Sequence, residues 1–262
     1  MHLNIDPVIF YAFGYPILRW YSLAYILGFV CAYFLFKKMN DFTTREQMES
    51  MFNYAFFGVI LGGRLGYVVF YNLKYYLHHP LEILAVWQGG MSFHGGLIGV
   101  AIGLVWFCKK HNVDVWKVAD IAPVCATPGL FFGRIANFIN GELWGAKTTL
   151  PIGFVFPASG TMEPRHPTQL YEATLEGLVV FVITFLLYRK KSSRNGKIFA
   201  LFLILYGTFR FAIEFVREPD IQIGYIILNT FTMGHLLCFG MVVTGLIFYY
   251  KDKLFKTFIK IF

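Results

Sequence analysis

The chain has 262 residues, of which 57% are apolar and only 15% charged. Soluble domains do not have this balance, so the composition excludes an ordinary soluble protein and indicates an integral membrane protein. The net charge of +8 does not require nucleic acid as a partner, because membrane topology and the anionic inner leaflet account for most of it.

Apolar stretches of about 20 residues, the length that crosses a bilayer, predict an all-α, polytopic bundle of seven transmembrane helices. They lie at residues 17–36, 51–72, 92–108, 118–139, 168–188, 197–216 and 232–250. The first has a polar lead-in and no small-residue cleavage site, which favours a retained helix over a removable signal peptide. We expect a single membrane domain over 1–262, with a short extracytoplasmic loop region near 140–167.

The positions of lysine and arginine predict the orientation, since short cytoplasmic loops are enriched in both. Fifteen of the 23 lie in one set of connections: Lys37, Lys38, Arg45, Lys109, Lys110, Lys117, Arg189, Lys190, Lys191, Arg194, Lys197, Lys251, Lys253, Lys256 and Lys260. The opposite set holds five, namely Arg19, Lys74, Lys147, Arg165 and Arg217. The amino terminus is therefore predicted outside and the carboxyl terminus in the cytoplasm.

The remaining three arginines, Arg64, Arg134 and Arg210, lie inside apolar stretches. A cation within the membrane is costly, so such residues point to function. A guanidinium fork can hold phosphate bidentately, which makes an anionic lipid headgroup the first candidate ligand.

With this orientation, other polar residues fall at the depth of the arginines, near the outer surface. They are Tyr21, His94, Arg134, Asn137, Asn140, Glu142, Arg165, His166, Gln169, Tyr171, Glu172, Arg210, Glu214 and Arg217. Because segments far apart in sequence meet at one depth, we predict a single site there.

Helical spacing groups some of these residues on common faces. Tyr206, Arg210, Glu214 and Arg217 form one stripe. Glu214 either contributes to a ligand site or only neutralises Arg210 as a buried pair, and the two roles are compatible.

A second face, on the fourth span, combines Arg134, Asn137 and Gly141. An arginine beside an amide complements phosphate oxygens, and glycines here permit close approach of a backbone or ligand.

His94 opens the third span between Phe93 and two glycines. Histidine titrates near neutral pH, so His94 is a candidate for proton exchange; the alternative is a hydrogen-bonded core residue. No histidine pair has the spacing of a zinc helix, and the four cysteines, in apolar stretches without C-x-x-C spacing, suggest neither a disulfide framework nor a zinc site. We predict no metal and no cofactor.

One long run, from Gly133 through Arg134, Asn137 and Glu142 to Gly145, resembles the signature of the prolipoprotein diacylglyceryl transferases, bacterial membrane enzymes. The resemblance extends over nearly the whole chain, through residues 6–10, 62–67, 92–99, 165–172 and 214–220. The outer stretch 146–164 departs from the family, which leaves contacts with a peptide substrate open.

The family's functional positions fall on residues of the expected type: Tyr21, His94, Asp120, Arg134, Asn137, Glu142, Gly145, Tyr206, Arg210, Glu214 and Arg217. The resemblance implies catalytic roles for His94, Arg134, Arg210 and Tyr21. It implies substrate binding by Arg134, Asn137, Glu142, Gly145, Tyr206, Glu214 and Arg217. Asp120 lies at the inner end of its span, where a helix-pairing role suits it better.

The implied reaction transfers diacylglycerol from phosphatidylglycerol to the lipobox cysteine thiol of a prolipoprotein, forming a thioether and releasing glycerol phosphate, in the bacterial cytoplasmic (inner) membrane. A thiol with its usual pKa of about 8.5 needs a base or a positive field. His94 could take the proton, or the arginines could favour the thiolate, while Arg134 and Arg210 stabilise the leaving phosphate. No cysteine of the chain is expected in the outer cluster, so the partner supplies the thiol.

Two alternatives come from other classes. A transporter or lipid-flipping protein could bind an anionic solute through the same arginines, but such proteins commonly contain internal repeats, and residues 1–131 and 132–262 share no motif. A structural membrane scaffold would not need three buried guanidinium groups.

Overall fold

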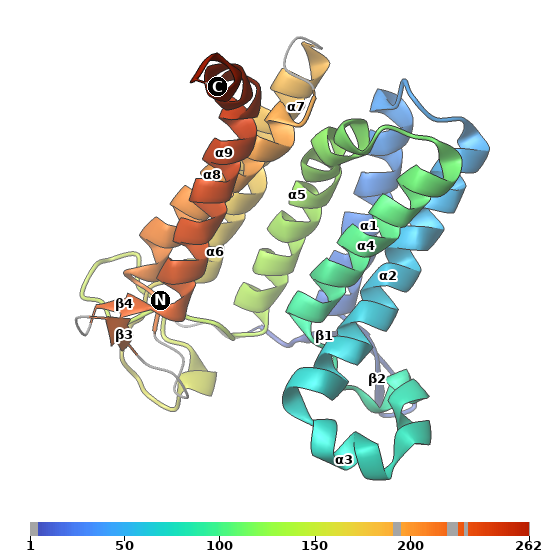
Figure 1. Ribbon diagram of the computed structural model, residues 1–262. Helices are drawn as coiled ribbons and strands as arrows, with labels where there is room; N and C mark the ends of the chain where they lie inside the picture. The colour runs from blue at the N-terminus through green and yellow to red at the C-terminus, as the bar shows by residue number, and fades with distance from the viewer. Residues whose placement is uncertain (1–4, 191–194, 219–224, 228–229, 262) are drawn as a thin grey trace. The chain divides into compact units, whose positions relative to one another are not determined.

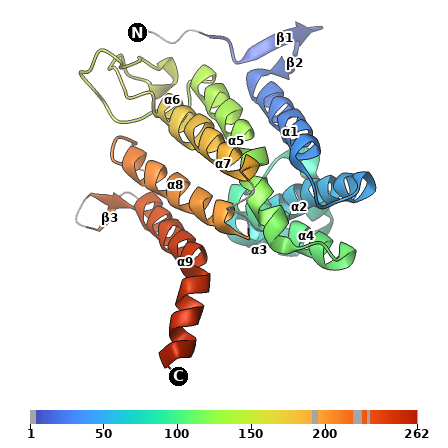
Figure 2. The same ribbon diagram turned by 90° about the horizontal axis from the view of Figure 1, so that it is seen from above.

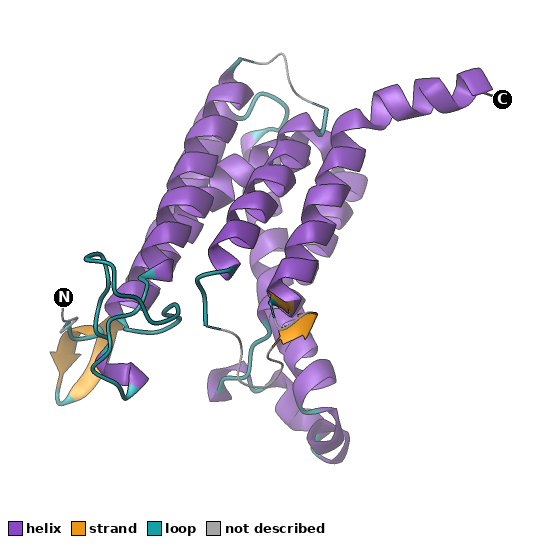
Figure 3. Cartoon of the chain, turned by 90° about the vertical axis from the view of Figure 1, so that its left-hand side faces the viewer, coloured by secondary structure: helices purple, strands orange, loops and turns teal. Residues whose placement is uncertain are grey.

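The computed structural model describes residues 5–190, 195–218, 225–227 and 230–261. The chain forms two compact units: Met1–Met39 with Ala119–Phe262, and Asn40–Val118. Helix dominates both units, and strands are confined to two short hairpins (Figure 3).

The long helices follow the predicted spans (Figure 1). They are α1 (Trp20–Met39), α2 (Arg45–Tyr71), α4 (Phe93–His111), α5 (Val115–Ile139), the continuous series α6 (Thr168–Glu172), η4 (Ala173–Val179) and α7 (Val180–Arg189), then α8 (Lys197–Glu214) and α9 (Met233–Ile261). The η4 segment is a π-helix.

Five of these helical stretches, within the described part of the chain, are long and apolar enough to cross a membrane: α1, α2, α5, α6 to α7, and the Met233–Tyr250 part of α9. The chain is therefore a multi-pass membrane protein. The count of seven spans and the orientation stay predictions. Of the charges used for the orientation, Lys191 and Arg194 lie outside the described residues.

Several short elements flank the long helices, and the first predicted span begins as a strand, not a helix, over residues 17–19. A hairpin of β1 (Val8–Ala12) and β2 (Tyr15–Arg19) precedes α1, and β3 (Tyr225–Ile227) pairs with β4 (Phe231–Thr232) before α9. Three short helices follow α2: α3 (Leu73–His78), η1 (Pro80–Leu84) and η2 (Val86–Gln88). A fourth, η3 (Pro157–Ser159), lies in the loop of residues 140–167.

In the unit of residues 40–118, α2 and α4 lie side by side because glycines remove the side chains between them (Figure 1). A Cβ at Gly62 would lie 2.4 Å from the carbonyl oxygen of Gly95, and one at Gly99 would lie 2.1 Å from that of Gly58. Small residues at such contacts let helix backbones approach closely in membranes.

Arg64 is buried in this same unit, and its guanidinium donates to backbone carbonyls of the segment that follows α2. Nε donates to Ile83 (2.8 Å), Nη2 to Glu82 (2.6 Å) and Nη1 to Gly89 (2.5 Å). The structure thus gives Arg64 a structural role, since charge-assisted bonds to carbonyl groups keep an intramembrane cation satisfied.

In the other unit, α5 lies near α6 and α7, and α8 packs along α9 (Figure 2). Asp120 links α5 to α8: its carboxylate accepts the backbone N–H groups of Gly196 (2.8 Å), Ile198 (2.9 Å) and Phe199 (3.1 Å). A carboxylate at a helix N-terminus satisfies orphan donors and complements the helix dipole. The expected helix-pairing role of Asp120 is confirmed.

Two predicted helix faces end earlier than the sequence spacing suggested. α8 ends at Glu214, so Arg217 leaves the stripe and forms an isolated backbone bridge with Gly145. α5 ends at Ile139, and Gly141 has a φ of +65°. Glycine adopts this left-handed conformation readily at helix ends, so Gly141 terminates the helix and is not part of its face.

Candidate active site

The centre of the site is a buried cluster of two arginines and three glutamates from α5, α6, η4 and α8. Arg134 Nε lies 3.0 Å from Glu172, and its Nη2 lies 3.9 Å from Glu176. Arg210 pairs with the same Glu172 through Nη1 and with Glu214 through Nη2 at 3.0 Å. Two guanidinium groups from different helices therefore meet at one carboxylate.

Close helix packing explains how these charges meet. A Cβ at Gly177 would lie 2.8 Å from Phe131 Cα, so η4 lies directly against α5. The wider π-helical turn displaces the side chains that follow Glu172, and single π-turns within helices are frequent at functional sites. Glu176 lies within this π-helical segment, and the Tyr206 hydroxyl lies near Glu176 and both arginines.

Exposure within the cluster is uneven. The side chains of Glu172 and Glu176 are 1% exposed, whereas those of Arg134 and Arg210 are 20% and 12% exposed. The carboxylates are thus the buried part of the cluster, and the arginine side chains are its more accessible part. An anion that approaches this more accessible part meets cations first.

Asn137 and Glu142 form a second polar group at the end of α5. Asn137 Nδ2 donates to Glu142 Oε1 at 2.8 Å, and Asn140 Nδ2 donates to the same atom at 3.3 Å. Gln169 Nε2 donates to the backbone carbonyl of Glu142. These bonds fix the chain as it leaves α5, one turn beyond Arg134.

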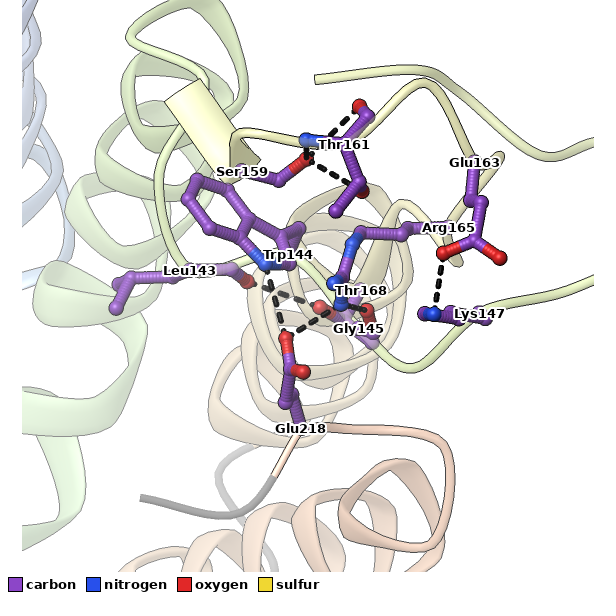
Figure 4. A network of polar contacts seen from close by, with 10 residues as sticks. All are labelled: Leu143, Trp144, Gly145, Lys147, Ser159, Thr161, Glu163, Arg165, Thr168 and Glu218. Atoms are coloured by element: carbon purple, nitrogen blue, oxygen red, sulfur yellow. Dashed lines mark hydrogen bonds and ion pairs between the residues drawn. The ribbon is translucent and has the colours of Figure 1, made fainter. Parts of the chain in front are cut away.

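The loop of residues 140–167 is tied to the segment after α8 by a network centred on Glu218 (Figure 4). Glu218 accepts from Trp144 Nε1 at 3.0 Å and from Arg165 Nη1 at 2.5 Å. In the same network, Thr168 donates to the Leu143 carbonyl at 3.0 Å. The loop that carries the predicted Gly145 is thus anchored to the start of α6 and the end of α8.

Gly145 itself is enclosed by protein. A Cβ there would lie 2.5 Å from the Val216 carbonyl oxygen and 2.6 Å from Thr168 Cγ2. Its backbone N–H donates to the His166 carbonyl at 2.8 Å. The position needs glycine because three chain segments converge on it, which favours a structural role over ligand contact.

Tyr21, which is in the same unit as the arginine cluster, forms none of its ion pairs. Tyr21, near the start of α1, is 37% exposed, and its hydroxyl lies 3.4 Å from that of Tyr25. Gly28, two turns further along α1, packs against Gly129 of α5. His94 is an exposed residue at the start of α4 and belongs to the unit of residues 40–118.

Several residues were not among the predicted functional positions. Glu176 follows Glu172 by four residues inside an apolar span, and the rule applied to buried arginine would have indicated it. Thr232 and His235 gave no comparable signal, because their contact with Glu214 depends on how α8 and α9 pack.

Cys238 corrects the expectation that no cysteine of the chain lies near the arginine cluster. It is buried on α9 and close enough for Arg210 and Glu214 to influence its thiol electrostatically. All four cysteines are free. Because Cys238 is only 4% exposed, burial keeps its thiol away from a substrate. In the described part of the chain, no group of three or more acidic, cysteine or histidine side chains is arranged to hold a metal ion.

Fold and cluster together define a multi-pass helical membrane protein. Its site contains two partly exposed arginines whose glutamate partners are buried. The sequence matches the family Prolipoprotein diacylglyceryl transferase over residues 7–251. Its similarity to individual members is also high. The chain is 50% identical over 249 residues to the phosphatidylglycerol–prolipoprotein diacylglyceryl transferase of Ehrlichia canis (strain Jake), covering 93% of this chain and 95% of the relative.

Two further relatives bear the same name. That of Oleidesulfovibrio alaskensis is 48% identical over 246 residues, with 92% of this chain and 91% of the relative covered. That of Geobacter sulfurreducens is 48% identical over 248 residues, with 93% and 94% covered. The chain belongs to the prolipoprotein diacylglyceryl transferase family.

Proposed function

We propose that this chain transfers the diacylglyceryl group of phosphatidylglycerol to the thiol of a prolipoprotein's lipobox cysteine. The reaction forms a thioether, releases glycerol phosphate and is the first step of lipoprotein maturation. Family membership supports the reaction. One observation carries the mechanism: Arg134 and Arg210 pair with the same buried carboxylate, that of Glu172, while their own side chains stay partly exposed.

The sulfur–carbon bond forms as the carbon–oxygen bond to phosphate breaks, and the electron pair of that bond remains on the phosphate oxygen. Negative charge therefore grows on the leaving group. Arg134 and Arg210 stabilise that charge, and their buried glutamate partners hold them in place before the substrate arrives. Preorganised cations in a water-poor site stabilise such charge more than water does.

Two ways of activating the thiol stay open. His94 accepts the proton, or the field of the two arginines favours the thiolate. Tyr21, Asn137, Glu142, Tyr206 and Arg217 are proposed to shape the surrounding substrate site. We propose that the reaction takes place in the outer leaflet of the bacterial cytoplasmic membrane. We also propose that the chain has seven spans, with its amino terminus outside and its carboxyl terminus in the cytoplasm.

The Arg134→Lys variant tests the phosphate role, because lysine keeps the charge but lacks the planar fork. We expect the rate of thioether formation on a precursor peptide in phosphatidylglycerol vesicles to fall about 10²- to 10³-fold. Arg45→Lys is the matched control: Arg45 forms an exposed pair with Glu49 and should keep full activity. Full activity of Arg134→Lys would remove the clamp from the mechanism.

His94→Asn tests the proton role. If His94 accepts the thiol proton, the variant should lose about 10²-fold or more in rate and the acidic limb of its pH profile should change shape. The measurement is the initial rate of thioether formation between pH 5.5 and about 9, a range that brackets the unperturbed histidine and thiol values. A pH profile identical to the parent's would assign thiol activation to the arginines.

A further inference from the structure

The first turn of α9 lies directly against Glu214, the glutamate that pairs with Arg210. Thr232 donates its hydroxyl hydrogen to Glu214 Oε1 at 2.7 Å, and Glu214 Oε2 lies 3.0 Å from Arg210 Nη2. A Cβ on Gly234 would lie 2.4 Å from Glu214 Oε1. The carboxylate thus occupies the space that the missing side chain of Gly234 leaves open.

His235 fixes Thr232 in turn. The backbone N–H of Thr232 donates to His235 Nδ1 at 3.1 Å, and the Thr232 hydroxyl oxygen also lies 3.1 Å from Nδ1. Because Nδ1 accepts from the backbone, it carries no hydrogen, and the single hydroxyl hydrogen of Thr232 is left for Glu214. The imidazole is held between the rings of Phe211 (4.8 Å) and Phe215 (4.5 Å).

This arrangement is half of a capping box. In a full capping box the third helical residue accepts from the N-cap backbone, while the N-cap hydroxyl caps the helix in return. Here His235 performs the first task, but Thr232 directs its hydroxyl to Glu214. Capping uses the hydroxyl oxygen as an acceptor, so capping alone does not explain why the hydroxyl hydrogen of Thr232 is donated to a neighbouring helix. The positive end of the α9 dipole also favours a carboxylate at this place.

All three side chains are buried: Glu214 is 8%, Thr232 7% and His235 2% exposed. A long glutamate side chain has several rotamers, and each bond removes freedom from it. Since Glu214 holds one edge of the Arg210 guanidinium and Glu172 another, fixing Glu214 also fixes the direction in which Arg210 faces a ligand.

We propose that Thr232, Gly234 and His235 are positioning residues that act through Glu214 to orient Arg210 toward the phosphate of the lipid substrate. The inference rests on the proposed function for its substrate, but not for the geometry of the chain. It extends the site to α9, which contributes none of the predicted site residues.

The kinetic test uses Thr232→Val, which keeps the shape of the side chain and removes the hydroxyl. Without this hydrogen bond to its charged partner the Glu214 carboxylate is held less firmly, so kcat/KM for thioether formation with phosphatidylglycerol should fall roughly 10- to 100-fold. Most of the loss should appear in kcat, because Arg210 opposes charge that develops in the transition state. Thr232→Ser restores the hydroxyl and should return kcat/KM to within about threefold.

Gly234→Ala supplies a second variant with a matched control on the same helix. Its new methyl group would displace the Glu214 carboxylate, whereas a Cβ at Gly240 meets nothing within 4 Å. We expect Gly234→Ala to lower kcat and Gly240→Ala to leave it unchanged. If Thr232→Val and Gly234→Ala both retain the parent kcat/KM per folded molecule, the inference is wrong.

A thermal-stability cycle with Thr232→Val and Arg210→Gln provides a readout independent of the reaction. Coupled residues give non-additive changes in the free energy of unfolding, so we expect a coupling clearly above the scatter of additive pairs. Additive changes would overturn the inference even if the enzyme is active. Conversely, a parent protein that forms no thioether while the cycle shows coupling would refute the proposed function and leave the positioning role standing.

Discussion

Glu172 is the residue on which the two arginines of the site depend. It forms ion pairs with both guanidinium groups, whereas Glu176 lies 3.9 Å from Arg134 and acts on Arg210 only through its electrostatic field. Removing one partner of a buried ion pair leaves an uncompensated charge and costs about 3–5 kcal/mol. The cost should therefore be concentrated at Glu172, although both glutamates are equally buried.

Two isosteric variants test that ranking. Glu172→Gln should lower the thermal midpoint and abolish most transferase activity, because both arginines lose their common partner. Glu176→Gln, four residues later, should lower both quantities much less. The measurement is thermal unfolding in detergent together with thioether formation per folded molecule. An equal loss in the two variants would show that distance does not rank these contacts.

At the scale of the helix, glycine decides which elements approach each other. α2 and α4 meet backbone to backbone at Gly58, Gly62, Gly95 and Gly99. Such contacts replace side-chain burial, which gives little driving force between helices in a membrane because lipid tails are equally apolar. The glycine crowding that makes the third span a poor transmembrane stretch by composition is thus the reason it packs.

Gly62→Ala tests the interface against a control in the same pair of helices. A methyl group at Gly62 would lie 2.4 Å from a backbone oxygen, whereas one at Gly96 would have ordinary contacts at 3.6 Å or more. Overpacking typically costs about 1–3 kcal/mol, so Gly62→Ala should lower the thermal midpoint and Gly96→Ala should not. Equal thermal midpoints for the two variants would mean that α2 and α4 can move apart to accommodate the methyl group at no cost in stability.

At the scale of the whole molecule, the sidedness of the chain is the prediction with the most consequences. Seven spans place the outer loop and the connection after α4 on opposite sides of the membrane. If only the five strongly apolar stretches crossed, with the amino terminus still outside and α4 and α8 not spanning, the two segments would exchange sides. The positive-inside distribution favours seven.

Single-cysteine variants, labelled in intact cells with a membrane-impermeant maleimide, distinguish the two arrangements. We expect labelling of Ala158→Cys from outside and none of Asn112→Cys or Asp41→Cys until the membrane is opened. The native cysteines give little background, since three are buried and Cys31 is partly so. Outside labelling of Asn112→Cys would show that α4 does not cross.

Apolar length and the positions of rare charges were sufficient to predict the helices and to select Arg134, Arg210 and Glu214. Both signals are local, because a bilayer imposes the same requirement on every segment that enters it. Spacing failed at the helix ends: Gly141 and Arg217 lie beyond the last turns of α5 and α8, and helical periodicity does not state where a helix stops.

The sequence by itself determined that this is a membrane protein, which family it resembles and which arginines are costly enough to require a purpose. Only the tertiary structure decided what those arginines contact. Arg64 is satisfied by backbone carbonyls, Arg134 and Arg210 share Glu172, and Thr232 reaches Glu214 from the residue before α9. The reason is physical: the cost of burying a charge belongs to the residue, whereas its compensation depends on neighbours that only packing brings within hydrogen-bonding distance.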